Sequence, residues 1–485
     1  MTSALVLTCF TAMASVASPM TTHIPPIKPY QAEIVGSWLG TLTVPGAELR
    51  IVFHITEGED GTLSATMDSP DQGAKGIPVS EVVFAAGHLK LVSAAVNGEF
   101  EGDLAEDGSQ IVGEWSQGGV VLPLTVSRTE EEVEGPPRPQ EPEPPLPYDS
   151  EEVVYPNTLG GNELAGTLTL PRSAGPHPAV VLISGSGPQD RDETVMGHRP
   201  FLVLSDHLTR LGIAVLRFDD RGVGGSTGDF AAATSEAFAT DVLAGVDYLL
   251  RRDDIDNEKI GLIGHSEGGL VAPMAAVQSD AVAFIVLMAG PAVTGEEIIL
   301  EQSVLISRAA GRSEADIQDD LATNREVFQI VKEEADLVVA AGRLKDLLTA
   351  RAAEMSPEER EQAGITEENL DTQIQAQIQQ ANTPWVRFFL TYDPAPTLAK
   401  VRIPVLAING ELDLQVPPNQ NLPLMRQILE DSGNLDYTVE ELPGLNHLFQ
   451  TAVTGAPSEY VRIEETISPV ALELMSQWIL ERVQR

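Results

Sequence analysis

The chain has 485 residues, enough for two or three domains, and it carries a net charge of −42 with an isoelectric point near 4.3. A surface this acidic repels polyanions, so the composition argues against nucleic acid as a partner. The single cysteine, Cys9, excludes an intrachain disulfide, and no cluster of cysteine and histidine suited to zinc occurs, so we expect no metal site.

The first segment has the form of a secretory signal peptide. Residues 4–17 are small and apolar, and Ser15-Val16-Ala17 resembles a cleavage site, although no positive charge precedes the apolar run. That run is too short to span a membrane, and no later segment qualifies. We therefore expect a signal peptide over 1–18, a mature protein in the periplasm or the medium, and no integral membrane span.

The next part of the chain predicts a small β domain over residues 30–128. Short runs of alternating apolar and polar residues recur there, with Gly, Asp and Asn between them. This pattern is typical of an antiparallel, barrel-like sheet that closes or nearly closes on itself. The clearest runs are 49–55, 63–67, 88–92 and 120–124. They contain no catalytic constellation, so packing, substrate presentation and ligand binding all stay open as roles.

Residues 129–149 predict a linker. They combine a run of three glutamates at 130–132 with a proline-rich stretch over 136–145. Proline stiffens such a segment and like charges extend it, so the segment cannot form a core of its own. We expect it to separate the β domain from the rest of the chain.

Gly264-His265-Ser266-Glu267-Gly268 is the most informative stretch of the chain. It follows an apolar, strand-like run and precedes a helix-like run. Strand, G-x-S-x-G and helix in this order form a nucleophile elbow, in which a strained turn holds a serine hydroxyl over the end of a sheet. A glycine-rich turn without chemistry is the alternative, and the motifs that follow argue against it.

Two further motifs accompany the elbow. A buried strand at 179–183 opens into the loop 184–190 (SGSGPQD), and a second strand is followed by the turn 219–226 (DDRGVGGS). With the elbow, these motifs resemble the α/β-hydrolases, as found in secreted bacterial esterases and in serine-aminopeptidase-like hydrolases. The resemblance covers residues 150–485 and implies a mostly parallel sheet with helices on both faces. It also implies that Arg221 in the second turn is structural and ties loops together.

In that family the catalytic residues follow the chain order serine, acid, histidine. Of the eight histidines, only His447 comes after the serine's own elbow, so it is the candidate base. The candidate acid is Asp413, just past the carboxyl end of a buried strand, where open α/β sheets build their sites. Glu411 in the same turn is the runner-up. Asp413 is favoured because G-x-x-D-x-x-V-P at 410–417 resembles the acid loop of the family.

The resemblance further implies an oxyanion hole made of two backbone N–H groups. One belongs to the residue after the nucleophile, which is Glu267, and the other to a loop that commonly begins His-Gly. This chain has Ser184 where that histidine stands, and we expect Ser186 to supply the second N–H.

Glycine-rich turns also raise the hypothesis of a nucleotide site, and the details argue against it. Asp190 and Thr227 stand where a dinucleotide-binding turn requires its third glycine, and the motif G-x-x-x-x-G-K-[ST] does not occur. We therefore expect no cofactor.

A helical cap is expected at about 292–395. The connection between two strand-like runs is longer there than the fold needs, and Thr294-x-x-Glu297 predicts a capped helix start. Such an insertion resembles the cap over many α/β-hydrolase sites. Four aromatic residues near its end are candidates to bind substrate, although their helical spacing also fits core packing: Trp385, Phe388, Phe389 and Tyr392.

These patterns predict a serine hydrolase that cleaves small to medium carboxylic esters through an acyl-enzyme, using a triad of Ser266, His447 and Asp413. The same triad serves serine peptidases and other acyl hydrolases that act on amides or thioesters, so this alternative stays open. A non-enzymatic binding protein with a degenerate hydrolase domain is the other alternative, and the complete triad argues against it. The sequence does not specify the natural substrate, the oligomeric state or the role of the β domain.

Overall fold

The computed structural model describes residues 34–484, apart from 45–46, 59, 97, 118–119, 132, 358–359, 361–364 and 368. The expected signal peptide at 1–18 lies outside the described residues. The described chain divides into two compact units. One holds the residues up to Pro137 together with Ala352–Gln373, and the other holds Arg138–Arg351 and the residues from Ile374 onward.

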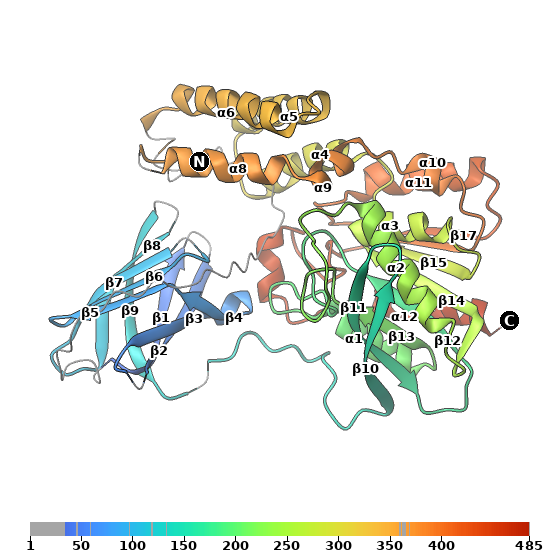
Figure 1. Ribbon diagram of the computed structural model, residues 1–485, viewed down its shortest axis with the longest axis horizontal. Helices are drawn as coiled ribbons and strands as arrows, with labels where there is room; N and C mark the ends of the chain where they lie inside the picture. The colour runs from blue at the N-terminus through green and yellow to red at the C-terminus, as the bar shows by residue number, and fades with distance from the viewer. Residues whose placement is uncertain are drawn as a thin grey trace. The chain divides into compact units, whose positions relative to one another are not determined.

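The first unit contains a nearly closed antiparallel sheet of nine strands, ordered β4-β3-β2-β1-β9-β8-β7-β6-β5 (Figure 1). Each strand pairs with its neighbour in antiparallel register, as the alternating sequence pattern predicts. The strands are β1 (Gly36–Val44), β2 (Ala47–Glu57), β3 (Leu63–Ser69), β4 (Ala74–Val79), β5 (Glu81–Ala85), β6 (His88–Ser93), β7 (Gly98–Leu104), β8 (Gln110–Gln117) and β9 (Val120–Thr129), with a short 3₁₀ helix η2 at Pro70–Gln72.

Aromatic side chains fill the interior of this β domain. Phe53 lies 5.2 Å from Phe100 and 6.2 Å from Trp115, measured between ring centroids, and Trp38 is fully buried beside them. A Cβ at Gly98 would lie 2.3 Å from the Trp115 ring, so a residue with a side chain does not fit there. The core of the domain is therefore packed with side chains, as in small barrels.

The second unit is built on an eight-stranded sheet ordered β10-β11-β13-β12-β14-β15-β16-β17. The strands β10, β11 and β13 pair antiparallel, and all later neighbours pair parallel. The strands are β10 (Tyr148–Asn157), β11 (Asn162–Pro171), β12 (His177–Ile183), β13 (Ala214–Phe218), β14 (Ile255–His265), β15 (Val282–Met288), β16 (Val405–Gly410) and β17 (Tyr437–Leu442).

Helices cover both faces of this sheet (Figure 1). Helices α1 and α12 pack together on one face, where they share an apolar core with β12, β15 and β16. Helices α2 and α3 contact each other on the other face, joined by α10 and α11. Every residue of β13 and β16 is buried, which agrees with parallel strands covered on both sides. The predicted α/β-hydrolase fold is thereby confirmed. The helices are α1 (Pro200–Arg210), α2 (Ser235–Leu249), α3 (Glu267–Ala276), α10 (Ala395–Leu398), α11 (Pro418–Asp431) and α12 (Pro469–Val483), with a 3₁₀ helix η3 at Pro457–Arg462.

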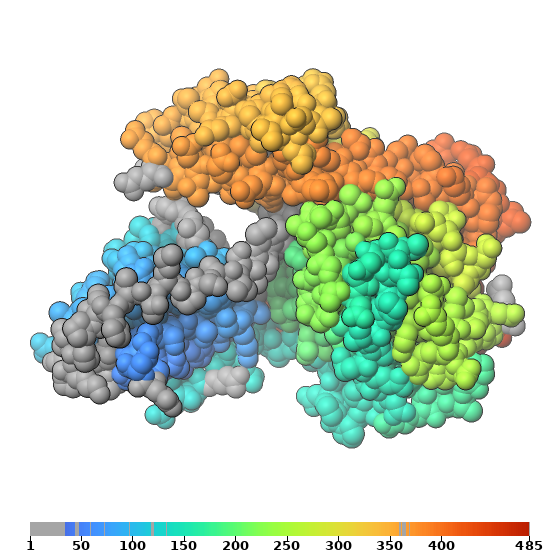
Figure 2. All heavy atoms as spheres, in the orientation of Figure 1, coloured from blue at the N-terminus to red at the C-terminus, as the bar shows by residue number. Residues whose placement is uncertain are grey.

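The expected helical insertion is present between β15 and β16. Its helices are α4 (Gly295–Ala309), α5 (Glu314–Glu333), α6 (Leu337–Glu354), α8 (Leu370–Ala381) and α9 (Pro384–Thr391). Thr294 caps α4 in a reciprocal box with Glu297, as its sequence predicts. The helices α4, α5 and α9 contact one another, and the yellow-to-orange layer that contains them is visible in Figure 2. Among the described residues, no helix combines the length and apolar character that a membrane span requires.

Part of the segment 129–149 is bound to the second unit. The guanidinium of Arg138 donates hydrogen bonds to the carbonyl oxygens of four residues, Met196, Gly197, Val461 and Ile463, at 2.8–3.2 Å. Gln140 bonds the backbone of Thr466 and Ile467, and Glu141 pairs with Arg199. We call residues 138–141 the strap. Because it joins two loops distant in sequence, the strap is a structural part of the α/β unit.

Candidate active site

Ser266 lies in a strained turn between β14 and α3. Its backbone has φ 53° and ψ −116°, a conformation that costs free energy for any residue other than glycine. A Cβ at Gly264 would lie 2.0 Å from the carbonyl oxygen of Gly268, and one at Gly268 would lie 2.1 Å from that of Ile183. Both glycines of the G-x-S-x-G motif are thus required by close backbone contacts, and the turn has the geometry of a nucleophile elbow.

His447 and Asp413 are joined by a hydrogen bond. His447 Nδ1 lies 2.8 Å from Asp413 Oδ2, and both side chains are buried. The other carboxylate oxygen, Oδ1, accepts the backbone N–H groups of Gln415 at 2.8 Å and Val416 at 2.9 Å. The acid is therefore held from both sides, and His447 Nε2 is left for another partner. Glu411, the runner-up acid, accepts the N–H of Gly444 instead, at 2.8 Å.

A second buried pair connects His447 to the elbow. His265, which precedes the serine, has its ring centroid 4.8 Å from that of His447, and its Nε2 lies 3.0 Å from the His447 carbonyl oxygen. Its Nδ1 lies 2.9 Å from Oε1 of Glu193. Burial alone would lower the pKa of His265, but the charge of Glu193 and its hydrogen bond outweigh this effect, so the pKa is raised. No sequence motif indicates this pair, whose members are 72 residues apart.

The loop after β12 lies against Ser266. A Cβ at Gly185 would be 3.3 Å from Ser266 Cβ, and the Gly185 N–H already donates to Glu193 Oε1 at 2.6 Å. Among the described residues, the N–H groups of Ser186 and Glu267 have no hydrogen-bond acceptor. The two expected oxyanion donors are therefore unpaired. Asp220 fixes the loop by accepting from Ser184 Oγ at 2.8 Å and from the Gln189 N–H at 2.9 Å.

The cap reaches the elbow through one aromatic residue. The indole N–H of Trp385 donates to Glu267 Oε1 at 2.7 Å, and Ser235 Oγ donates to the same oxygen at 2.6 Å. Burial raises the pKa of the Glu267 carboxyl, and these two donors offset part of that effect. The expected role of Glu267 involves only its backbone N–H, so the contacts of its carboxylate are a new feature of the site.

The other three aromatic candidates make different contacts. Phe389 stacks on Trp385 at 4.8 Å and packs against Gly295 at the start of α4. Phe388 stacks on Tyr392 at 5.0 Å, and the Tyr392 hydroxyl bonds Thr397 Oγ1 at 2.6 Å. The structure therefore brings Trp385 into contact with the elbow, whereas Phe389 packs against α4 of the cap and Tyr392 bonds to α10.

The turn at 219–226 has a structural role, as expected. Arg221 Nε donates to Asp241 Oδ2 of α2 at 2.7 Å, and both side chains are buried. Asp219 binds Arg191 and accepts the N–H of Gly225 at 3.0 Å. These contacts tie the turn to α2 and to the loop that carries Arg191.

The β domain also contains a serine, a histidine and an aspartate in one hydrogen-bonded row. Ser37 Oγ lies 2.8 Å from His54 Nδ1, and His54 Nε2 lies 2.9 Å from Asp68 Oδ2. The ring nitrogens are used in the opposite sense from His447, whose Nδ1 meets the acid. The row lies across neighbouring strands with 37% of the His54 side chain exposed, so cross-strand pairing accounts for it.

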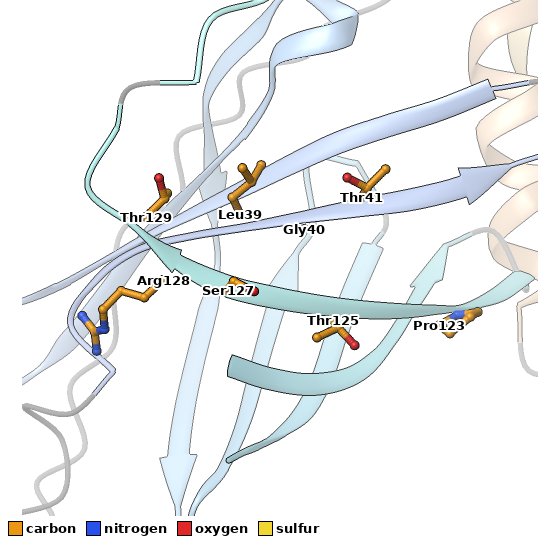
Figure 3. Close-up of a pocket in the computed structure, with 8 residues that line it drawn as sticks. All are labelled: Leu39, Gly40, Thr41, Pro123, Thr125, Ser127, Arg128 and Thr129. Atoms are coloured by element: carbon orange, nitrogen blue, oxygen red, sulfur yellow. The ribbon is translucent and has the colours of Figure 1, made fainter. Parts of the chain in front are cut away.

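A groove of about 630 Å³ also belongs to the β domain (Figure 3). It lies along β1 and β9, and its lining is mostly hydroxyl-bearing and apolar, with one charged residue. The lining residues are Leu39, Gly40, Thr41, Pro123, Thr125, Ser127, Arg128 and Thr129. Because these residues include no acid and no histidine, the groove offers no general base, and the candidate active site is the one at Ser266.

Comparison with known proteins places the chain among hydrolases. Residues 160–435 match the profile of the family described as X-Pro dipeptidyl-peptidase (S15 family). The chain is 35% identical to esterase EstD of Thermotoga maritima over 141 residues, which are 29% of this chain and 34% of that protein. It is 33% identical to the putative hydrolase YtaP of Bacillus subtilis over 128 residues, 22% of this chain and 42% of that protein. The chain thus spans less than half of the length of these curated relatives.

Solved structures of similar proteins include esterases and α/β-hydrolases. The esterase Est1E of Butyrivibrio proteoclasticus, with bound ferulic acid, is 17% identical, with a TM-score of 0.39 over 69% of this chain and 100% of that chain. The α/β-hydrolase GrgF of Penicillium sp. sh18 is 18% identical, with a TM-score of 0.41 over 70% of this chain and 100% of that chain. The fold assignment rests on the strand order and on the family match.

Proposed function

We propose that this chain, which belongs to the X-Pro dipeptidyl-peptidase (S15) family, is a serine hydrolase that cleaves carboxylic esters through an acyl-enzyme. The observation that carries the proposal is a buried hydrogen bond of 2.8 Å between His447 and Asp413, in which the backbone of His447 is linked to the serine elbow by His265. A serine needs a base, and the base needs an acid that fixes its tautomer.

The proposed reaction starts at His447. With Nδ1–H donated to Asp413, the neutral Nε2 takes the Ser266 proton while the serine oxygen attacks the ester carbonyl. The N–H groups of Ser186 and Glu267 then bind the oxyanion of the tetrahedral intermediate, where one such donor is worth roughly 3 kcal/mol. His447 gives its proton to the departing alkoxide, and a water molecule, activated by the same imidazole, releases the acid.

The cap is proposed to restrict the substrate to small or medium esters. Trp385 contacts Glu267, the residue after the nucleophile, so the indole lies beside the proposed reaction centre. The similarity to esterase EstD supports an ester substrate, although it covers 29% of the chain. Export to the periplasm or the medium stays a prediction.

A second candidate function is cleavage of amides, including X-Pro peptides, which the family description favours. The triad chemistry is the same, because His447 can protonate an amine leaving group as well as an alkoxide. The two candidates therefore differ in substrate recognition and not in the catalytic groups.

The test is a substrate panel applied to the wild-type protein and to Ser266→Ala in parallel. We expect turnover of p-nitrophenyl acyl esters, together with a fluorophosphonate adduct on Ser266, and neither in the variant. Turnover of an aminoacyl-prolyl arylamide without ester turnover would support the peptidase. Folded wild-type protein that forms no adduct and turns over neither substrate would support a binding protein instead.

A further inference from the structure

Outside the proposed triad, a second titratable pair lies buried beside the elbow. The side chains of His265 and Glu193 are 6% and 4% exposed, and they meet at 2.9 Å. Placing two ionisable groups in the interior is costly unless their hydrogen bonds are satisfied. The proposed reaction uses neither group, so the pair requires an explanation of its own.

The pair forms a continuous hydrogen-bonded chain between two parts of the proposed active site. Glu193 Oε1 accepts the N–H of Gly185 at 2.6 Å, in the loop that precedes the proposed oxyanion donor. The same oxygen lies 2.9 Å from His265 Nδ1. On the far side of the ring, His265 Nε2 lies 3.0 Å from the carbonyl oxygen of His447. One end of the chain is thus the oxyanion loop, and the other is the backbone of the proposed base.

The protons of this chain can be placed from the acceptors. The His447 carbonyl oxygen only accepts, so His265 Nε2 carries a hydrogen. One further proton lies between His265 Nδ1 and Glu193 Oε1, and the pair is neutral overall wherever that proton sits. The other carboxylate oxygen, Oε2, is buried, and among the described residues it has no hydrogen-bond partner. Oε1 therefore makes both contacts of Glu193 in this hydrogen-bonded chain, to Gly185 and to His265.

The backbone of Glu193 is held in an unusual conformation at this point. Its φ of 52° lies in the left-handed region, which costs free energy for a residue with a side chain. Its N–H donates to the Asp190 carbonyl oxygen at 2.9 Å, which closes the turn that carries it. In this backbone conformation the carboxylate accepts the Gly185 N–H and lies beside His265 of the elbow.

We propose that Glu193 and His265 are positioning residues that hold the oxyanion loop and the backbone of His447 in register with the elbow. The proposal rests on the function proposed above. Because His265 is also the neighbour of Ser266 in the chain, one imidazole ring fixes the nucleophile, the base and, through Glu193, the Gly185–Ser186 loop. Loss of the pair displaces groups that act in the transition state, so it should lower kcat more than it alters KM.

The variant Glu193→Gln removes the ionisable carboxyl group but keeps the size and shape of the side chain. Its amide oxygen can accept the Gly185 N–H, but it then presents a lone pair to a neutral His265 Nδ1. Its amide NH₂ can donate to that nitrogen, but Gly185 then loses its acceptor. Either way one buried hydrogen bond of the chain is lost, which corresponds to a fall in kcat of about 10- to 100-fold.

The experiment compares Glu193→Gln, His265→Gln and the double variant in the full chain. The measurements are kcat and KM for p-nitrophenyl butyrate and the rate of Ser266 labelling by a fluorophosphonate. Folding is monitored by circular dichroism. The control is Glu297→Gln, because glutamine also fits a capping box, so its kinetics should match the wild type.

We expect each single variant to lower kcat and the labelling rate by about 10- to 100-fold, with KM changed less than about threefold. The loss of kcat in the double variant should be no larger than that in the less active single variant, because both residues belong to one hydrogen-bonded chain. A folded Glu193→Gln with wild-type kcat, or losses that multiply in the double variant, would overturn the proposal. If Glu193→Gln does not fold, wild-type kcat in folded His265→Gln overturns it instead.

Ser266→Ala, measured in parallel, keeps this test separate from that of the proposed function. If Ser266→Ala is inactive while Glu193→Gln matches the wild type, only the positioning pair is refuted. If Ser266→Ala keeps its turnover, the proposed serine mechanism is refuted, and with it the role of the pair in positioning the groups of that mechanism.

Discussion

Replacing Asp413 by asparagine should abolish most turnover while leaving the fold intact. Asp413 Oδ1 accepts two backbone N–H groups, from Gln415 and Val416. An asparagine oxygen can keep both of these bonds only if its NH₂ takes the position of Oδ2, 2.8 Å from His447 Nδ1. That NH₂ donates, so His447 Nδ1 must become the acceptor and Nε2 must carry the hydrogen. The base then cannot take the serine proton.

The size of this effect follows from the tautomer. The same change in a serine-protease triad lowers kcat by about 10⁴-fold, which corresponds to roughly 5 kcal/mol in the activation barrier. Here we expect a loss of about 10³- to 10⁴-fold at neutral pH, measured as kcat on p-nitrophenyl esters. Because both backbone bonds survive in the variant, the circular dichroism spectrum and the melting temperature should change little.

The matched control is Glu411→Gln. Glu411 accepts the Gly444 N–H, a bond that the glutamine oxygen can also accept, so activity should stay within about twofold of the wild type. The reasoning is refuted by the opposite pattern, with Glu411→Gln inactive and Asp413→Asn active. Wild-type activity in both variants would show that neither carboxylate is needed for turnover, and it would remove Asp413 from the proposed mechanism.

Three further predictions use other parts of the molecule. Ser266→Ala should lower ester turnover by about 10³-fold or more and prevent fluorophosphonate labelling, and wild-type turnover in a pure preparation would exclude this serine. Trp385→Phe keeps the stack on Phe389 but removes one donor to Glu267, so thermal denaturation should show a loss of about 1–2 kcal/mol, with KM raised; unchanged values would make the contact irrelevant. Burial lowers the pKa of His198 to about 4, so between pH 6.5 and 4 the unfolded chain binds a proton that the folded chain does not. The free energy of unfolding should therefore decrease as the pH is lowered from 6.5 to 4. In His198→Gln, the free energy of unfolding measured in urea should change less with pH over this range than in the wild type. An identical pH dependence would contradict this assignment.

The elbow could be predicted from the sequence because its steric demands act over a few residues. Gly264 and Gly268 are required by contacts within the turn and with the neighbouring strand β12, so the motif itself carries the information. His447 could be proposed as the base because no other histidine follows the elbow in the chain, and it lies within hydrogen-bonding distance of the proposed acid. Local pattern and chain order were sufficient for these features.

The Glu193–His265 pair could not be predicted in the same way. Its residues are 72 positions apart, and neither lies in a motif that predicts the contact. The contact between Trp385 and Glu267 spans 118 positions and depends on how the cap packs on the α/β unit. Both contacts arise from tertiary packing, and no local periodicity in the sequence indicates them.

The strap determines where the α/β unit can be separated from the β domain. Four carbonyl oxygens in two loops share the guanidinium of Arg138, so a shortened chain that begins at residue 150 leaves all four without this donor. A chain that begins at Pro137 retains it. For modular engineering, the exchange point at which the β domain can be replaced by an unrelated domain therefore lies between Thr129, the end of β9, and Arg138.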